Sequence, residues 1–281
     1  MEESNTTHVL LTRYNLRTAW TDATVTNDAQ GWHDDRALIF ENICLPSVFG
    51  QTHRPDIWLI GFDSSKREYV RRVLDLLSPH PWIVPIWQSS SDGRHETSQR
   101  LFERAIGSLF VSRHKRIITT RLDNDDAIAL NYCAEVRRHA TARIKLRPDE
   151  QDFWLTFPRG VQLCNGAVQP FTRLNNQFLS RCIISDGEPL GDIPTALSGN
   201  HAVVLQQSPY VEIDDCQAMF LQFVHRTNAA NRGRSRAGPI LQAEGALTRF
   251  GLTAEVLEFS ARLYDPDKLA LVRARWAKKR K

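Results

Sequence analysis

The sequence predicts an α/β protein built on a doubly wound sheet, in which parallel strands alternate with helices. Residues 57–62 are continuously apolar, as expected of a strand that is covered on both faces. Strand-like and helix-like segments alternate through the first half of the chain. Two of the predicted strands end at an aspartate, Asp63 or Asp123. In such a sheet, ligands bind beyond the carboxyl ends of the strands.

Each element of the first half has its own signal. Strands are predicted from apolar runs, and helices from apolar residues at helical spacing after a capping residue. Asp34 and Asp35 are read as caps of the first helix, which Pro46 should stop, and Ser65 opens a capping box. The expected strands are 9–11, 57–62, 82–87 and 117–122, and the expected helices are 34–45, 65–77, 101–110 and 128–136.

The pattern changes after Pro148, where short apolar segments are separated by turns and no helix is predicted between them. A mixed or antiparallel sheet laid on the first half is expected here. Its strands are 153–157, 161–164, 178–184, 202–205 and 219–224, followed by a basic loop at 231–239 and helices at 254–263 and 267–281. We expect one domain at 1–240, with halves at 1–147 and 148–240. Residues 241–281 then form C-terminal helices with a basic tail.

Composition excludes several classes of protein. Of 281 residues, 42% are hydrophobic and 24% are charged, which is far from the composition of a disordered chain. The net charge is +4, but seven basic residues and no acid lie among the last fourteen residues, so the rest of the chain is slightly acidic. A nucleic-acid-binding surface is therefore not indicated. No signal peptide or long apolar span is present, and we expect a cytoplasmic protein.

The segment that carries most chemical information is 121–126, Arg-Leu-Asp-Asn-Asp-Asp. In an extended stretch, Asp123 and Asp125 point the same way, while Asp126 can turn back to cap the next helix. Closely spaced carboxylates at a strand end repel one another unless they bind a cation, and Mg²⁺ or Mn²⁺ prefers such oxygens. The alternative is a structural cap. Asp265 and Asp267 have the same spacing, but a turn between two helices explains them.

Three stretches together give a resemblance. They are the motif at 121–127, the segment LIFENICLPSVFGQ at 38–51 and the segment FLQFVHRTN at 220–228. The chain resembles the rhamnosyltransferase family of bacterial glycosyltransferases, with matches spread from about residue 9 to residue 232. The resemblance implies a GT-A fold with a mixed central sheet flanked by helices. It implies that 1–240 is the catalytic domain, with a nucleotide-binding half at 1–147 and an acceptor half at 148–240. It also implies a nucleotide-sugar donor, with dTDP-L-rhamnose as the candidate, and a D-x-D motif that holds Mn²⁺ or Mg²⁺ on the diphosphate.

Further site residues follow from this resemblance and from the strand ends. His225 is expected to complete the metal or diphosphate site with Asp123 and Asp125; the alternative is a surface or capping histidine. Asn228 would donate to a phosphate or form a turn. The predicted topology places the other donor-binding candidates at the same sheet edge, and Asp63 could instead cap the following helix. These candidates are Thr12, Arg13, Tyr14, Asn15, Asp63, Arg94, Arg100 and Arg121.

An inverting transferase needs a carboxylate to deprotonate the acceptor hydroxyl. We select Asp215, because the adjacent Asp214 can raise its pKa and because it lies one strand from His225. The other candidates are Asp214, Asp186, Glu188 and Asp192.

The function predicted from these features is transfer of rhamnose from a nucleotide sugar to a bacterial surface polysaccharide or glycolipid. The basic amphipathic C-terminus would touch an anionic membrane surface, although a solvated helix end is an equal alternative. Two other classes remain open at this point. One is an aspartyl-type, metal-dependent phosphohydrolase, and the other is a non-catalytic module that binds carbohydrate or a membrane surface.

Overall fold

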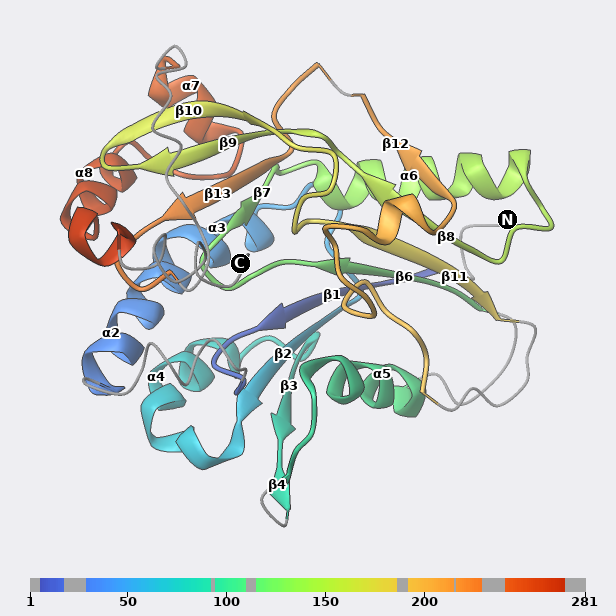
Figure 1. Cartoon of the computed structure of the whole chain (residues 1–281), viewed down its shortest axis with the longest axis horizontal. Helices are drawn as coiled ribbons and strands as arrows, with labels where there is room; N and C mark the ends of the chain where they lie inside the picture. The colour runs from blue at the N-terminus through green and yellow to red at the C-terminus, as the bar shows by residue number, and fades with distance from the viewer. Residues whose placement is uncertain are drawn as a thin grey trace.

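The structure is a computed structural model that describes residues 6–17, 29–91, 94–109, 115–185, 192–214, 216–228 and 241–270. Seven strands form the main sheet in the order β12-β8-β11-β6-β1-β2-β3 (Figure 1). Strands β1, β2, β3 and β6 are mutually parallel, whereas β11 runs antiparallel to both of its neighbours, β6 and β8. The bounds are β1 (Thr6–Arg13), β2 (Ile57–Asp63), β3 (Ile83–Gln88), β6 (Lys115–Arg121), β8 (Asp152–Thr156), β11 (Ser180–Ser185) and β12 (Tyr210–Glu212).

A smaller four-stranded sheet has the order β10-β9-β13-β7. Its strands are β7 (Ala127–Ile128), β9 (Arg159–Cys164), β10 (Ala167–Thr172) and β13 (Phe220–Val224). A short hairpin pairs β4 (Ser90–Ser91) with β5 (Arg94–His95). The α/β architecture expected of a GT-A fold, a mixed central sheet flanked by helices, is confirmed. Strands from both predicted halves of the chain join the main sheet.

Helices cover both faces of the main sheet, as a doubly wound fold requires. One face packs against α4 and α6 and against the helical segment that begins with α2, and the other packs against α5. The bounds are α2 (Ala29–Ile39), α3 (Leu45–Phe49), α4 (Arg67–Leu77), α5 (Ser98–Leu109), α6 (Tyr132–Leu146), α7 (Ala243–Thr248) and α8 (Glu255–Arg262), with short turns η2 (Phe40–Cys44), η3 (Ser64–Lys66) and η4 (Val204–Gln206).

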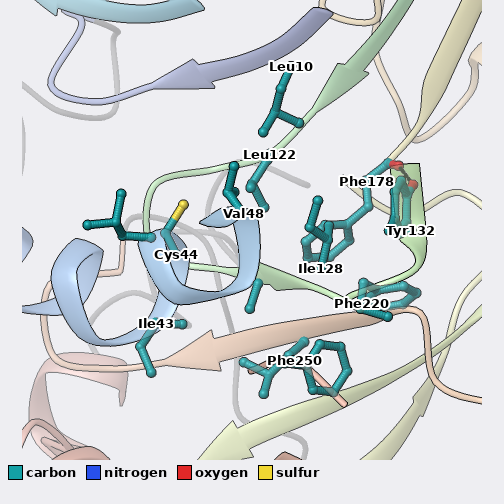
Figure 2. Close-up of a cluster of buried hydrophobic side chains, with 14 of the residues drawn as sticks. Leu10, Ile43, Cys44, Val48, Leu122, Ile128, Tyr132, Phe178, Phe220 and Phe250 are labelled. Atoms are coloured by element: carbon teal, nitrogen blue, oxygen red, sulfur yellow. Dashed lines mark hydrogen bonds between the residues drawn. The ribbon is translucent and has the colours of Figure 1, made fainter. Parts of the chain in front are cut away.

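The largest apolar cluster joins the two sheets. Leu10 of β1, Val48 of α3 and Leu122 lie together below the end of β6, and Phe220 of β13 lies at the smaller sheet (Figure 2). All four side chains are completely buried. The ring of Phe220 also stacks on that of Phe178, with centroids 4.5 Å apart. This packing fixes the position of the backbone that leads into the acidic segment.

The prediction that Pro46 ends the first helix is wrong. The helical segment runs from Ala29 to Phe49 and passes Pro46, because residues Phe40–Cys44 adopt a wider π-helical turn. The Leu45 N–H donates to the Phe40 carbonyl across this turn, and Pro46 sits at the start of the α-helical geometry that follows. Proline is tolerated there because it lacks only a donor that a first turn leaves unpaired.

Other differences are local. Ile128 belongs to β7 rather than to the helix, and residues 204–206 form a 3₁₀ turn rather than a strand. Strands β10 and β12 and helix α7 were not predicted. Pro85 lies in β3, at the edge of the sheet, where a missing N–H is harmless. In the part of the chain that the structure describes, no helix is long and apolar enough to cross a membrane.

Candidate functional site

The candidate site lies where the strand order reverses. From β1 the chain continues to β2 and β3 on one side of the sheet and then crosses to β6 on the other side. Parallel strands β1 and β6 therefore lie next to each other and end at Arg13 and Arg121. In Figure 1 the tip of β1 points toward the side on which α2 and α4 lie. Such a switch point creates the crevice in which α/β sheets bind ligands.

Asp123 emerges from this edge. The preceding residue, Leu122, is anchored by its buried side chain and by its N–H, which donates to the Leu11 carbonyl at 3.0 Å. The Asp123 carboxylate is 23% exposed and accepts from Arg13 at 2.8 Å and from Arg121 at 3.3 Å. Burial alone would raise the pKa of Asp123, but the two guanidinium groups outweigh burial and hold that pKa below its usual value. The carboxylate is therefore ionised.

Asp125 lies deeper. Its Oδ2 atom meets Nη1 of Arg36 at 2.7 Å, Nε2 of His225 at 3.0 Å and Nδ2 of Asn228 at 3.0 Å. Burial opposes ionisation of this carboxyl, yet Arg36 and the contact with His225 hold the pKa of Asp125 well below its usual value. Burial lowers the pKa of His225 despite Asp125, which favours the neutral imidazole. The structure thus brings together Asp125, His225 and Asn228, as the sequence predicted.

The side chain of Asp126 contacts none of the arginines that pair with Asp123 and Asp125. One carboxylate oxygen accepts from the N–H of Phe223 in β13 at 2.9 Å and the other from Gln177 at 3.3 Å. The expected role as a helix cap is wrong, because β7 follows and α6 begins only at Tyr132. Burial, together with the charge of Asp125, raises the pKa of Asp126 well above its usual value. Asp126 joins the acidic segment to the smaller sheet.

Arg36 is the main site residue that sequence reasoning missed. Its guanidinium also donates to Asn124 at 3.1 Å and to the Thr227 carbonyl at 2.9 Å. The neighbouring Asp35 pairs with Arg226 through two contacts of 2.7 Å, so α2 is held against the segment after β13. The predicted role of Asp35 as a helix cap is wrong, because α2 begins at Ala29, and Asp35 and Arg36 both lie inside it. Apolar periodicity gives no signal for a buried charged residue.

Arg121 is a buried cation with few partners. Its side chain is 9% exposed and contacts Asp123 and Nδ1 of His201, each at 3.3 Å. Its Nε atom is buried and has no hydrogen-bond partner among the described residues. Burial and the nearby Arg13 lower the pKa of Arg121. Burial and Arg121 lower the pKa of His201 to about 4.

The side chains of Thr12 and Tyr14, at the end of β1, are too deeply buried to contact a bound donor as expected. The Thr12 hydroxyl is buried and accepts from the indole of Trp58 at 2.9 Å. Tyr14 is 4% exposed, and its ring packs between those of Phe40 and Phe62. Tyr14, a donor-binding candidate, therefore presents no free ring face to a nucleobase in this arrangement, and Thr12 belongs to the core.

Asn15 and Asp63 face each other. The Asn15 side-chain oxygen accepts from the Asp63 N–H at 2.9 Å. The Asp63 carboxylate accepts from the Ser65 N–H at 2.9 Å and from Arg17 at 2.8 Å. Asp63 thus caps the 3₁₀ turn before α4, which was the structural alternative for this residue. It still lies at the carboxyl end of β2, on the same edge as Arg13.

The remaining candidates are outside this group. Arg100 is exposed on the first turn of α5 and is not among the described residues that contact Asp123 or Asp125. Asp214 is 67% exposed and pairs with Arg159. Asp192 is exposed as well. The side chain of Arg94, the loop residues 186–191 with Asp186 and Glu188, the loop at 231–239, Asp215 and the tail beyond Ala270 lie outside the described residues. Asp265 caps a terminal helical turn through the N–H groups of Asp267 and Lys268, as expected.

The residues that were expected to hold Mn²⁺ or Mg²⁺ do not fit a resident divalent cation in this arrangement. Asp123 and Asp125 each face an arginine, and the Oδ2 atom of Asp125 already meets three nitrogen atoms. In the described ranges, no group of three or more histidine, cysteine, aspartate or glutamate side chains is arranged to hold a metal ion. What the geometry does supply is a set of guanidinium groups at the switch point, which suits an anionic ligand.

Comparison with known proteins identifies the family. No curated protein sequence matches the chain. Among solved structures, the inositol-1-phosphate CTP transferase from T. maritima matches at 9% identity with a TM-score of 0.33, over 92% of this chain and 96% of that one. At this identity and TM-score, the match supports no conclusion about the fold or function of this chain. The family model "Putative rhamnosyl transferase" matches residues 14–237, which begin directly after β1 and include the end of β6, the acidic segment and β13 with His225. The chain therefore belongs to this family of rhamnosyl transferases and is a glycosyltransferase.

Proposed function

We propose that the protein transfers rhamnose from a nucleotide-diphosphate sugar, with dTDP-L-rhamnose as the first candidate, to a glycan acceptor. The observation that carries the proposal is the position of Arg13 and Arg121 at the switch point of the sheet. The family match, residues 14–237, begins directly after Arg13 and includes Arg121. A diphosphate bound there meets guanidinium groups, whose planar N–H pairs match phosphate oxygens. The name of the family supports the choice of sugar.

In the proposed reaction, the acceptor hydroxyl attacks the anomeric carbon as the bond from that carbon to the diphosphate oxygen breaks. A single displacement of this kind inverts the anomeric configuration. The hydroxyl proton passes to a carboxylate base, and Asp215 remains the candidate for that role. The negative charge that develops on the leaving diphosphate is stabilised by the positive groups at the strand ends. The product is a nucleoside diphosphate and a glycoside with one added sugar.

The proposed acceptor is a precursor of a bacterial surface polysaccharide or glycolipid. A lipid-linked acceptor would place the protein next to an anionic membrane surface. The basic residues of 268–281 would favour that position, because each basic residue near such a surface contributes about 1 kcal/mol of attraction. Sedimentation with anionic and neutral vesicles tests this part separately from the transfer reaction.

A thermal-shift screen of nucleotide sugars tests the donor. A ligand present at about 100 times its Kd stabilises a protein by about 2.7 kcal/mol. For 281 residues, an unfolding entropy of about 2.1 cal/mol/K per residue converts this into a rise in Tm of about 4–5 °C. We expect such a rise with dTDP-L-rhamnose and smaller rises with UDP- or GDP-linked sugars. A Tm that no nucleotide or nucleotide sugar changes would contradict the proposed function.

A further inference from the structure

We infer that Arg13, Arg36 and Arg121, rather than a resident divalent cation, neutralise the diphosphate of the donor. This inference rests on the proposed function and concerns the groups that perform it. It differs from the sequence-based expectation, in which Asp123, Asp125 and His225 hold Mn²⁺ or Mg²⁺. The three arginines come from β1, α2 and β6, and the fold brings them to one edge of the sheet.

The first argument is the balance of charge. Arg13 and Arg121 share the carboxylate of Asp123, and Arg36 pairs with that of Asp125. Three guanidinium groups thus contact two carboxylates, since the oxygens of Asp126 accept from the Phe223 N–H and from Gln177 and not from an arginine. A divalent cation at this place would lie next to three guanidinium groups, which repel it. The same groups attract an anion.

The second argument is the presence of unused donors. The Nε atoms of Arg36 and Arg121 are buried and have no hydrogen-bond partner among the described residues. The side chains of these two arginines are 8% and 9% exposed, so water does not readily compensate for the missing acceptors. The two other contacts of Arg121 are long, 3.3 Å each, and are easily exchanged for shorter ones to a phosphate.

The third argument concerns the place that a cation would need. To reach Oδ2 of Asp125, an ion would have to displace the guanidinium of Arg36, which lies 2.7 Å away. Arg36 is tied at the same time to Asn124 and to the Thr227 carbonyl. Its displacement would break the contact with Thr227, which, beside the Asp35–Arg226 pair, holds α2 against the segment after β13. The guanidinium of Arg36 thus occupies the position next to Asp125 at which a metal ion would neutralise the charge of that carboxylate.

The test compares nucleoside diphosphate binding with and without divalent cations. The full-length wild-type protein is mixed with dTDP, UDP or GDP in EDTA or in Mn²⁺, and Tm is measured. We expect one nucleotide to raise Tm by the same amount in both conditions. A rise that occurs only with Mn²⁺ would overturn the inference and leave the proposed function intact. If no nucleotide raises Tm in either condition, the result contradicts the proposed function itself, and with it the inference that rests on it.

Binding measurements on variants of the three-arginine group provide a second, independent test. Arg121→Gln and Arg13→Gln should each weaken nucleotide binding in EDTA by about tenfold or more, since each loses charge-assisted hydrogen bonds to phosphate. Arg13 is 29% exposed, so its replacement is the less disruptive of the two. The matched control is Arg138→Gln, because Arg138 is 62% exposed on α6 and pairs only locally with Glu135 among the described acids. Equal affinities in folded variants and control would overturn the inference.

Discussion

Replacing Arg36 by methionine is expected to destabilise the protein more than the loss of an ordinary ion pair. The side chains of Arg36 and Asp125 are 8% and 9% exposed, and their contact is 2.7 Å long. Without Arg36, the contacts that Asp125 keeps among the described residues are those with His225 and Asn228, and it stays buried with an uncompensated charge. Breaking a buried pair by removing one partner costs about 3–5 kcal/mol.

This cost translates into a measurable change in Tm. With an unfolding entropy of about 2.1 cal/mol/K per residue, 281 residues give about 0.6 kcal/mol/K. Arg36→Met should therefore lower Tm by about 5–8 °C, and urea denaturation should show the matching loss of unfolding free energy. Adding Asp125→Asn removes the buried charge, so the double variant should be more stable than Arg36→Met alone.

The control for this prediction is Arg138→Met. Arg138 pairs with Glu135 at 2.6 Å, as closely as Arg36 pairs with Asp125, but it is 62% exposed. Exposed pairs contribute about 0.2–1 kcal/mol, so the control should lower Tm by less than about 2 °C. Equal changes in the two single variants would refute the reasoning, because they would show that burial does not set the cost of losing Arg36.

Two further predictions concern packing and pH. Gly160→Ala places a methyl group against the ring of Phe220 and should cost about 1–3 kcal/mol in urea denaturation. In contrast, Gly245→Ala in α7 meets open space and should stabilise slightly; similar effects of both variants would contradict the close packing. Burial lowers the pKa of His33 to about 4 from the 6.5 of an unfolded chain. The unfolded state thus binds the proton first, and the unfolding free energy falls as pH falls from about 6.5 to 4. His33→Phe, which keeps a ring against Tyr69, should reduce that slope in denaturation curves, and an unchanged slope would show that His33 does not contribute to it.

The sequence predicted those parts of the fold that have a strong local signal. Continuous apolarity identified β2, helical spacing identified α4 and α5, and the strand before Asp123 was placed correctly. These signals arise from burial of a whole element face. Strand β12, with three residues, buries too little to produce such a pattern. The π-helical turn before Pro46 is equally invisible, because it depends on a hydrogen bond rather than on composition.

The sequence predicted where the residues of the candidate site lie along the backbone better than it predicted which side chains contact one another. Strand ends located Arg13 and Asp123, and His225, which the resemblance assigned to the same site as Asp125, contacts it. Local sequence does not show which charged groups face each other across the fold. Arg36 lies inside a helix, 88 residues from Asn124 and 191 residues from Thr227, so its role depends on tertiary structure alone.

These separations bear on when the site forms during folding. Contacts between segments 88 to 191 residues apart require closure of most of the chain, and such closures are slow compared with helix formation. Residues of α2 leave the ribosome long before those of β13. Arg36 is therefore synthesised before its partners Asp125 and Thr227, and cannot pair with them until they have been added to the chain. A nascent chain that stops before β13 therefore lacks Thr227, His225 and Asn228, which contact Arg36 and Asp125. Only a nearly finished polypeptide acquires this complete set of contacts.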